Sequence, residues 1–225
     1  MSDLDESFEA DYNPPSSVFS SPPHEYEAYA AVSGFGESDV NSLEGSETEE
    51  AGADDAQLEK TAKTIYLTQH PGIAQRELGG REIGKNEAIW RVSSFRSDWG
   101  PENLRDNNPW TYWQSNCPDP RKNHTIDVIF HQATLIRQVS LFLDFFQDES
   151  YTPRTICIRC GTSRRDLLDL MTIECEQDFV GWLNADVMSK NDGEPFRLWF
   201  LQIAILNTHS NGRDTHIRQI KVFAS

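Results

Sequence analysis

The stretch TIDVIF at residues 125–130 decides the fold class, because apolar and polar residues alternate along it. Ile126, Val128 and Phe130 share one face of an extended chain, which is the pattern of a half-buried β-strand. Four further segments with strand character follow along the chain: Gln138–Phe145, Thr155–Cys160, Arg197–Leu206 and Gln219–Phe223. In the first of these, the apolar face consists of Val139, Leu141, Leu143 and Phe145.

The segments between these strands contain turn-forming residues, as in Asp148–Ser150, Asn191–Gly193 and Asn211–Gly212. From residue 81 onward the one helical signal is the short Gly100–Arg105, which has a proline at its start. Short strands about 10–20 residues apart, with no long helix between them, are typical of a β-sandwich. We therefore predict an all-β fold, a jelly-roll β-sandwich over residues 81–225.

The N-terminal part has a different composition. The chain has 225 residues and a net charge of −16, and residues 1–60 hold sixteen acidic side chains against one lysine. This region is rich in Ser, Pro and Gly and cannot bury enough apolar area to offset about 1–2 kcal/mol of backbone entropy per ordered residue. We predict a disordered acidic tail at 1–58 and a partly ordered lead-in at 59–80, with a possible helical turn at 60–68.

Composition also excludes several classes of function. An acidic tail on a nearly neutral body disfavours nucleic-acid binding. The sequence contains no run of about 18 apolar residues, so it predicts no membrane span. The first ten residues lack the charged and apolar regions of a secretory signal. We therefore expect an intracellular protein whose four cysteines are reduced thiols.

The sequence offers little catalytic or metal-binding chemistry. Cys157 and Cys160 form a C-x-x-C spacing, but residues three apart in a strand point to opposite faces and cannot share an ion. His209, Asp214 and His216 could be imagined as a base or a metal site, yet no nucleophile motif or nucleotide-binding motif accompanies them. We predict no metal, no cofactor and no enzymatic activity.

Polar side chains are concentrated in the loops that would lie at the ends of the sandwich. The richest segments are Leu104–Asn108, Thr111–Ser115, Asp148–Pro153 and Asn211–His216. Within them, Trp113 is expected to fill the core and Asp106 to tie loops together. On the residues alone, two interpretations stay open: the polar side chains stabilise the loops, or they bind a peptide or a sugar.

These loop sequences resemble the DOC-domain family, in the form in which it occurs as subunit 10 of the anaphase-promoting complex/cyclosome. The matching segments run in family order from residue 81 to the end of the chain. They are Arg81–Gly84, Ala88–Trp90, Ser93–Ser94, Leu104–Asn107, Thr111–Ser115, Asp148–Pro153, Gly181–Trp182, Gln202–Ala204, Asn211–His216 and Arg218–Lys221. TYWQS at 111–115 and NGRDTH at 211–216 are long, unusual strings, so chance agreement on both is negligible.

The resemblance implies a jelly roll similar to galactose-binding domains and a non-catalytic role in a ubiquitin ligase of the cell cycle. The family acts with a WD-repeat coactivator as co-receptor for the destruction box, the R-x-x-L degron of substrates, and slows substrate release. The resemblance also implies contacts with cyclosome scaffold subunits and localisation to the nucleus and cytoplasm. Carried over by motif, the degron-binding residues are Asn211, Arg213, Asp214, His216, Ser150 and Tyr151.

Two other functions remain as alternatives: a glycan-binding module, and a DOC-type protein outside the cyclosome. Family members commonly continue past the last strand to an Ile-Arg end that docks in a TPR scaffold subunit. This sequence stops at Ser225, so we expect it to enter the complex through sandwich contacts alone, or to be a truncated or divergent form. The acidic tail is interpreted as a solubilising extension, with regulation through Ser21–Pro22 as the other hypothesis.

Overall fold

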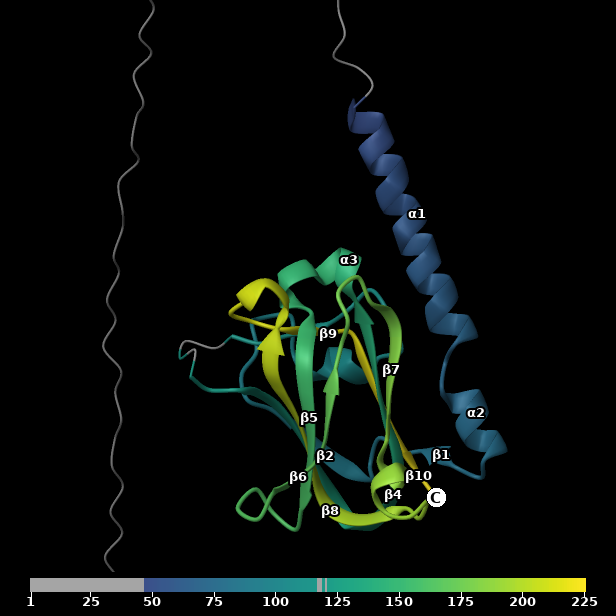
Figure 1. The fold of residues 1–225 in the computed structure, drawn as a ribbon, viewed down its shortest axis with the longest axis vertical. Helices are drawn as coiled ribbons and strands as arrows, with labels where there is room; N and C mark the ends of the chain where they lie inside the picture. Colours follow the sequence, from purple (N-terminus) through teal and green to yellow (C-terminus); the bar gives the residue numbers. More distant parts are fainter. Residues whose placement is uncertain (1–46, 117–118, 120) are drawn as a thin grey trace, which may run out of the picture. The chain divides into compact units, whose positions relative to one another are not determined.

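The computed structural model describes residues 47–116, 119 and 121–225, and these form a sandwich of antiparallel strands (Figure 1). The strands are β1 (Arg81–Glu82), β2 (Ala88–Val92), β3 (Trp113–Gln114), β4 (His124–Asp144), β5 (Pro153–Gly161), β6 (Leu168–Glu174), β7 (Val180–Asp186), β8 (Phe196–Thr208), β9 (His216–Ile217) and β10 (Gln219–Ala224). The helices are α1 (Glu47–Thr68), α2 (Gly72–Glu77) and α3 (Phe145–Asp148), with 3-10 turns η1 (Pro101–Arg105), η2 (Glu149–Tyr151), η3 (Val187–Lys190) and η4 (His209–Asn211). The predicted all-β jelly roll is confirmed.

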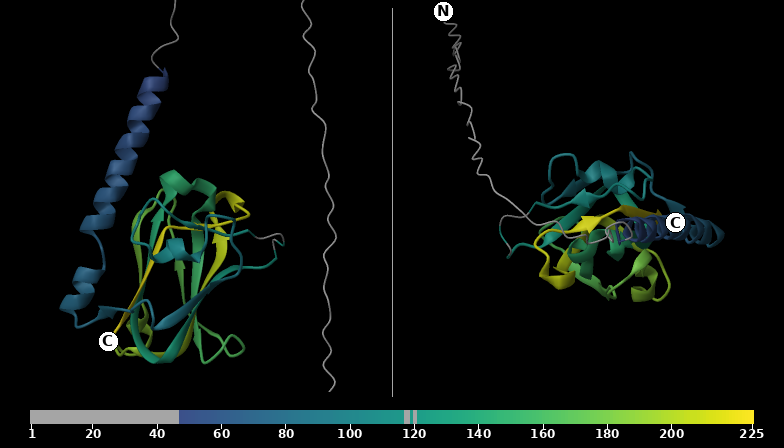
Figure 2. Two further views of the ribbon diagram at one scale, coloured as in Figure 1. Left: turned by 180° about the vertical axis from the view of Figure 1, so that it is seen from behind. Right: turned by 90° about the horizontal axis from the view of Figure 1, so that it is seen from above.

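Strand β4 belongs to both layers of the sandwich. Its first part, around Ile126–Ile129, pairs with β2 and β8, and β8 continues the layer to β5 and β6. Its last part, Gln138–Asp144, pairs with β10 and β7. The register of the β4–β8 pairing shifts between Ile129 and Thr134, and such an irregularity bends a strand from one sheet toward another. The two layers face each other in Figure 2.

The core consists of the alternating apolar residues that the sequence pattern predicted. In β4, Ile126, Val128, Val139 and Leu141 are fully buried. Trp113 is also fully buried, and its indole donates a hydrogen bond to the Ser94 carbonyl at 2.9 Å. The expectation that Trp113 fills the core is therefore confirmed.

Two strand predictions needed correction. Segments 125–130 and 138–144 are parts of one continuous strand, which ends before Phe145, so Phe145 does not continue its buried face. Phe145 instead begins α3, because the Asp144 carboxylate accepts a hydrogen bond from the Gln147 backbone at 3.3 Å and caps the helix. This turn sends the chain into the loop that carries Ser150.

The lead-in region also differs from the prediction. Helix α1 covers 47–68, which includes residues 47–58 of the predicted tail and the segment 60–68, for which a helical turn was expected. The reason is a short apolar stripe near the end of the helix, where Tyr66 stacks on Trp182 with ring centroids 5.3 Å apart. Gly181 adopts φ +146°, a backbone conformation that favours glycine, and lies next to Ile65 of the helix. The prediction of disorder at 1–46 lies outside the described residues.

None of the described helices is long and apolar enough to cross a membrane.

Candidate functional site

Two loops far apart in the sequence meet at one end of the sandwich. Figure 1 shows α3 and η4 at this end, and the loop between β5 and β6 at the other. We call residues 145–152 and 209–215 the rim loops. The Thr215 hydroxyl donates to the Tyr151 carbonyl at 3.0 Å, and the His209 amide donates to the Thr152 carbonyl at 3.0 Å. The predicted residues of the two loops are therefore brought together.

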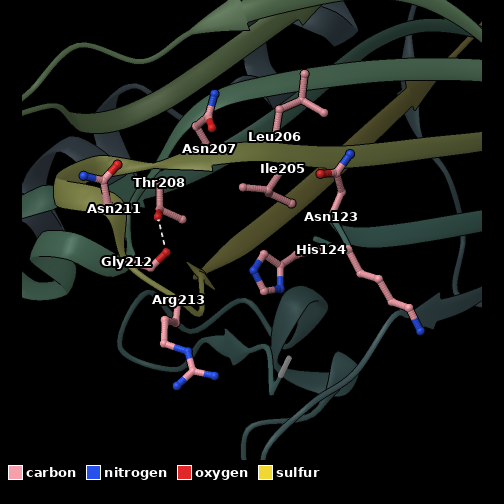
Figure 3. A pocket seen from close by; sticks show the side chains of 10 residues that line it. Asn123, His124, Ile205, Leu206, Asn207, Thr208, Asn211, Gly212 and Arg213 are labelled. Carbon is pink, nitrogen blue, oxygen red and sulfur yellow. Dashed lines mark hydrogen bonds between the residues drawn. The ribbon is translucent and has the colours of Figure 1, made fainter. Parts of the chain in front are cut away.

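Glycine is required where the rim loops are closest. A Cβ atom added at Gly212 would lie 2.1 Å from the Ser150 carbonyl oxygen, which is far inside van der Waals contact. The Gly212 carbonyl in turn accepts a hydrogen bond from the Thr208 hydroxyl at 2.7 Å, drawn as a dashed line in Figure 3. The close approach of the two loops therefore explains why the NGRDTH string has glycine at position 212.

The rim loops enclose a cavity of about 390 Å³. We call it the rim cavity; it is lined by Arg96, Asn116, Ser150, Tyr151, Gly212, Arg213 and Asp214. Four of the six predicted site residues line it, namely Ser150, Tyr151, Arg213 and Asp214. Tyr151 remains 37% exposed.

Asn211 and Arg213 are exposed and also line a second cavity, of about 240 Å³, beside β4 and β8 (Figure 3). Figure 3 shows the Arg213 guanidinium pointing away from β8. Among the described residues, no carboxylate lies within salt-bridge distance of Arg213. Arg213 is therefore available to a ligand. His124 also lines this cavity, and burial lowers the pKa of its imidazole, so it is neutral at pH 7.

Asp214 is held by neighbouring side chains and is only 7% exposed. The Arg96 guanidinium donates to its Oδ2 atom at 3.1 Å, and the Ser115 hydroxyl donates to Oδ1 at 3.3 Å. The same hydroxyl accepts a hydrogen bond from the Thr215 backbone amide at 2.9 Å. Ser115, the last residue of TYWQS, therefore fixes the backbone and side chain of this rim loop.

His216 is also buried, with 7% of its surface exposed, and a carboxylate holds its ring. Its Nδ1 atom lies 3.0 Å from the Asp148 Oδ1 atom. Asp148 accepts two further hydrogen bonds from Arg218, both at 2.8 Å. The Nε2 atom of His216 is buried and has no hydrogen-bond partner. His216 does not line the rim cavity; together with Tyr112, Asp148 and Arg218 it lines a separate cavity of about 380 Å³.

Four rings form a continuous stack beneath the rim loops, and we call it the aromatic column. Trp99 stacks on Tyr112 with centroids 4.2 Å apart, Tyr112 stacks on His216 at 4.1 Å, and His216 stacks on Tyr151 at 4.3 Å. The planes differ by 0°, 20° and 11°. Burial and the Asp148 charge raise the pKa of Tyr112, so its hydroxyl is protonated at neutral pH. Sequence reasoning missed Trp99, Tyr112, Asp148 and Arg218 as parts of this cluster, although the segments of Tyr112, Asp148 and Arg218 had been singled out.

A second network holds the loop before β3, and it confirms the expectation for Asp106. Gln219 donates through Nε2 to Asp106 Oδ1 at 2.6 Å and to the Asn103 carbonyl at 2.8 Å. Asp106 also accepts from the Thr111 hydroxyl. The segments that carry Tyr112 and Ser115 are thereby tied to β10.

The described residues contain little that suggests metal or thiol chemistry. No group of three His, Cys, Asp or Glu side chains in that part of the chain lies close enough to hold an ion. Ile158 and Cys160 face the core, whereas Cys157 lies on the other face of β5. Burial raises the pKa of Cys175 to about 11 and also raises that of Cys157 and Cys160, which disfavours thiolates. The site is suited to binding through hydrogen bonds and ring faces.

Comparison with known proteins identifies a family. Residues 51–225 match the family described as "Anaphase-promoting complex, subunit 10 (APC10)". A protein of that name from Drosophila melanogaster is 40% identical over 165 residues, which cover 73% of this chain and 82% of the relative. The Homo sapiens protein of that name is 36% identical over 172 residues, covering 76% of this chain and 81% of the relative.

Solved structures support the fold at low sequence identity. A family 32 carbohydrate-binding module from C. perfringens NanJ, solved with galactose, superposes with a TM-score of 0.52 at 10% identity. The match covers 64% of this chain and 98% of that one. At this identity the likeness establishes the sandwich fold alone.

Proposed function

The chain belongs to the anaphase-promoting complex subunit 10 family, and from that premise we propose that it recognises destruction-box substrates for this ubiquitin ligase. In this proposal it acts with a WD-repeat coactivator, contacts cyclosome scaffold subunits, and works in the nucleus and cytoplasm during the cell cycle. It makes and breaks no covalent bond itself. Other subunits transfer ubiquitin.

One observation carries the proposal. The residues transferred from the family motif come from two loops about 60 residues apart, yet Ser150, Tyr151, Arg213 and Asp214 line one cavity. A polar cavity on a rigid sandwich suits a short extended segment, whose backbone groups need hydrogen-bond partners. Such a surface is expected where a linear degron is held and no chemistry takes place.

Burial separates the six residues into two groups. Asn211 and Arg213 are exposed, and Ser150 and Tyr151 are partly so; we propose that these four contact the degron. Asp214 and His216 are buried and already bonded, and we propose that they hold the loops in place. This revises the role that the sequence suggested for Asp214 and His216, while keeping both in the site.

The effect on ubiquitination follows from two weak contacts that act together. A small polar surface gives an affinity on the order of millimolar to micromolar. When a coactivator holds the other end of the same segment, the second contact becomes intramolecular and the local concentration rises. The gain appears mainly as slower release, so more ubiquitins are added in each encounter.

The test is complementation of a ligase that lacks its own subunit 10. The double variant N211A/R213A should reduce the number of ubiquitins added per encounter to an R-x-x-L substrate. Loss of one or two hydrogen bonds to a charged group corresponds to about a tenfold faster release. The matched control is R165A, an exposed arginine in the loop at the opposite end of the sandwich. If N211A/R213A assembles and performs like R165A, the degron assignment is wrong.

Titration with galactose distinguishes this proposal from the glycan-binding alternative. We expect no saturable binding of galactose, because the proposed ligand is a peptide. Pull-down with cyclosome scaffold subunits tests the second alternative, a role outside the complex: absence of the chain from the captured assembly would favour that role.

A further inference from the structure

The aromatic column has an open end. Tyr112 and His216 each stack between two rings, and of the four rings only Tyr151 lines the rim cavity. One face of the Tyr151 ring lies on His216 at a centroid distance of 4.3 Å. The exposed 37% of Tyr151 therefore lies at its other face and its edge.

We propose that the outer face of Tyr151 is a stacking subsite for a planar, neutral or anionic side chain of the bound segment, and that Tyr112 is a positioning residue for it. This inference rests on the proposed function and adds a substrate preference to the same site. The ligand group would become the fifth member of the column.

The charges around the rim cavity set the class of ligand. Two guanidinium groups, Arg96 and Arg213, and one carboxylate, Asp214, line it, so the lining has a net positive charge. Arg96 already pairs with Asp214 at 3.1 Å, which leaves Arg213 unpaired among the described residues. A Lys or Arg side chain of the ligand would be attracted to the Tyr151 face, but the net positive charge of the lining repels it. An aromatic ring, an amide, or a planar carboxylate that pairs with Arg213 fits this lining without that repulsion.

The geometry also explains why the column is needed. Rings with centroids 4.1–4.3 Å apart are in van der Waals contact along the whole column. Each stacked pair contributes a modest energy beyond its buried area. Asp148 and Arg218 hold the His216 ring in plane from the side. Without Tyr112, the faces of His216 and then of Tyr151 lose their support, although Tyr112 does not reach the rim cavity.

The experiment uses small probes, so that it does not depend on degron binding. Amide NMR spectra of the full chain are recorded with benzoate, which is planar, and with cyclohexanecarboxylate, which has the same charge but no flat face. We expect benzoate to shift the amides of Ser150, Tyr151, Gly212 and Arg213 with a millimolar Kd. Binding of cyclohexanecarboxylate should be about two- to tenfold weaker, the range that one aromatic stacking contact gives.

Variants test the column. Y151L should abolish the preference for benzoate, Y112L should reduce it, and Y112F, which keeps the ring, should restore it. Trp99→Leu, at the far end, is the second variant if Y112L does not fold. W110L is the control, because Trp110 is an exposed aromatic residue outside the column. Equal binding of the two probes, or an unchanged preference in both Y112L and W99L, overturns the proposal.

A final competition connects the subsite to the proposed function. An R-x-x-L peptide held by the coactivator should displace benzoate from the wild-type protein. If benzoate binds as expected but is not displaced, the subsite stands and its assignment to the degron path is overturned. If the peptide does not bind the assembled complex at all, the proposed function fails while the probe result remains.

Discussion

The buried pair of Arg218 and Asp148 gives the sharpest prediction of stability. Their side chains are 5% and 3% exposed, and two hydrogen bonds of 2.8 Å join them. Replacing Arg218 with Met leaves a buried carboxylate without its main partner, and such a loss costs about 3–5 kcal/mol. For a domain of this size, that lowers Tm by roughly 6–20 °C.

The assay is thermal and urea unfolding followed by circular dichroism. The matched control is Arg159→Met, since Arg159 donates to Asp169 at 2.7 Å but that carboxylate is 67% exposed. Exposed pairs are worth about 0–1 kcal/mol, so R159M should be almost neutral. The double variant R218M/D148L should recover most of the loss, because it removes the buried charge as well. If R218M is no less stable than R159M, the Arg218–Asp148 pair does not stabilise the rim loops.

Three further predictions concern the loops, the lead-in helix and pH. G212A should cost about 1–3 kcal/mol of unfolding free energy and weaken degron binding, because its Cβ clashes with the Ser150 carbonyl; wild-type binding by G212A would contradict this. W182A should expose residues 47–68 to limited proteolysis, because Tyr66, His70 and Phe142 pack on Trp182, whereas W182F should protect them; equal cleavage of the two variants would refute the docking. Burial lowers the pKa of His70, His124 and His209 below 6.5, so the unfolded chain binds more protons and stability should fall as pH drops below about 7. H124Q should flatten that slope, and an unchanged slope would argue against the buried neutral imidazole.

Much of the sandwich could be predicted because alternation is a local signal. Ile126, Val128, Val139 and Leu141 are two residues apart within their segments, and that period alone places them on one face. The bend that joins 125–130 and 138–144 into one strand could not be predicted. It depends on the shifted pairing of β4 with β8, which is a property of the partner strand.

Helix α1 was missed for a physical reason. The window 47–68 is dominated by Glu, Asp, Lys and Ala, and the residues that pack on the sheet are few and lie near its end. Its docking depends on Trp182 and Phe142, more than 70 residues away along the chain. A composition argument cannot detect such a contact.

The site was only partly predictable. Family motifs supplied all six residues, Asn211, Arg213, Asp214, His216, Ser150 and Tyr151, and loop sequence alone left binding and loop stabilisation equally open. In the structure, Asp214 and His216 are buried while Asn211 and Arg213 are exposed, and this difference is the basis of the two roles proposed within one motif. The stacking of Trp99 on Tyr112 and of Tyr112 on His216 brings three loops together, and no spacing in the sequence encodes it.

Site-specific photocrosslinking tests the central claim most directly. A photoreactive amino acid is placed at position 150 or 213 in the rim, or at position 165 at the opposite end, and the chain is assembled with the ligase, coactivator and a labelled R-x-x-L peptide. The account predicts crosslinks from positions 150 and 213, none from 165, and loss of all of them when the peptide's Arg and Leu are replaced by Ala. Crosslinks from 165 as strong as those from 150, or crosslinks that survive the Arg and Leu replacements, would contradict it.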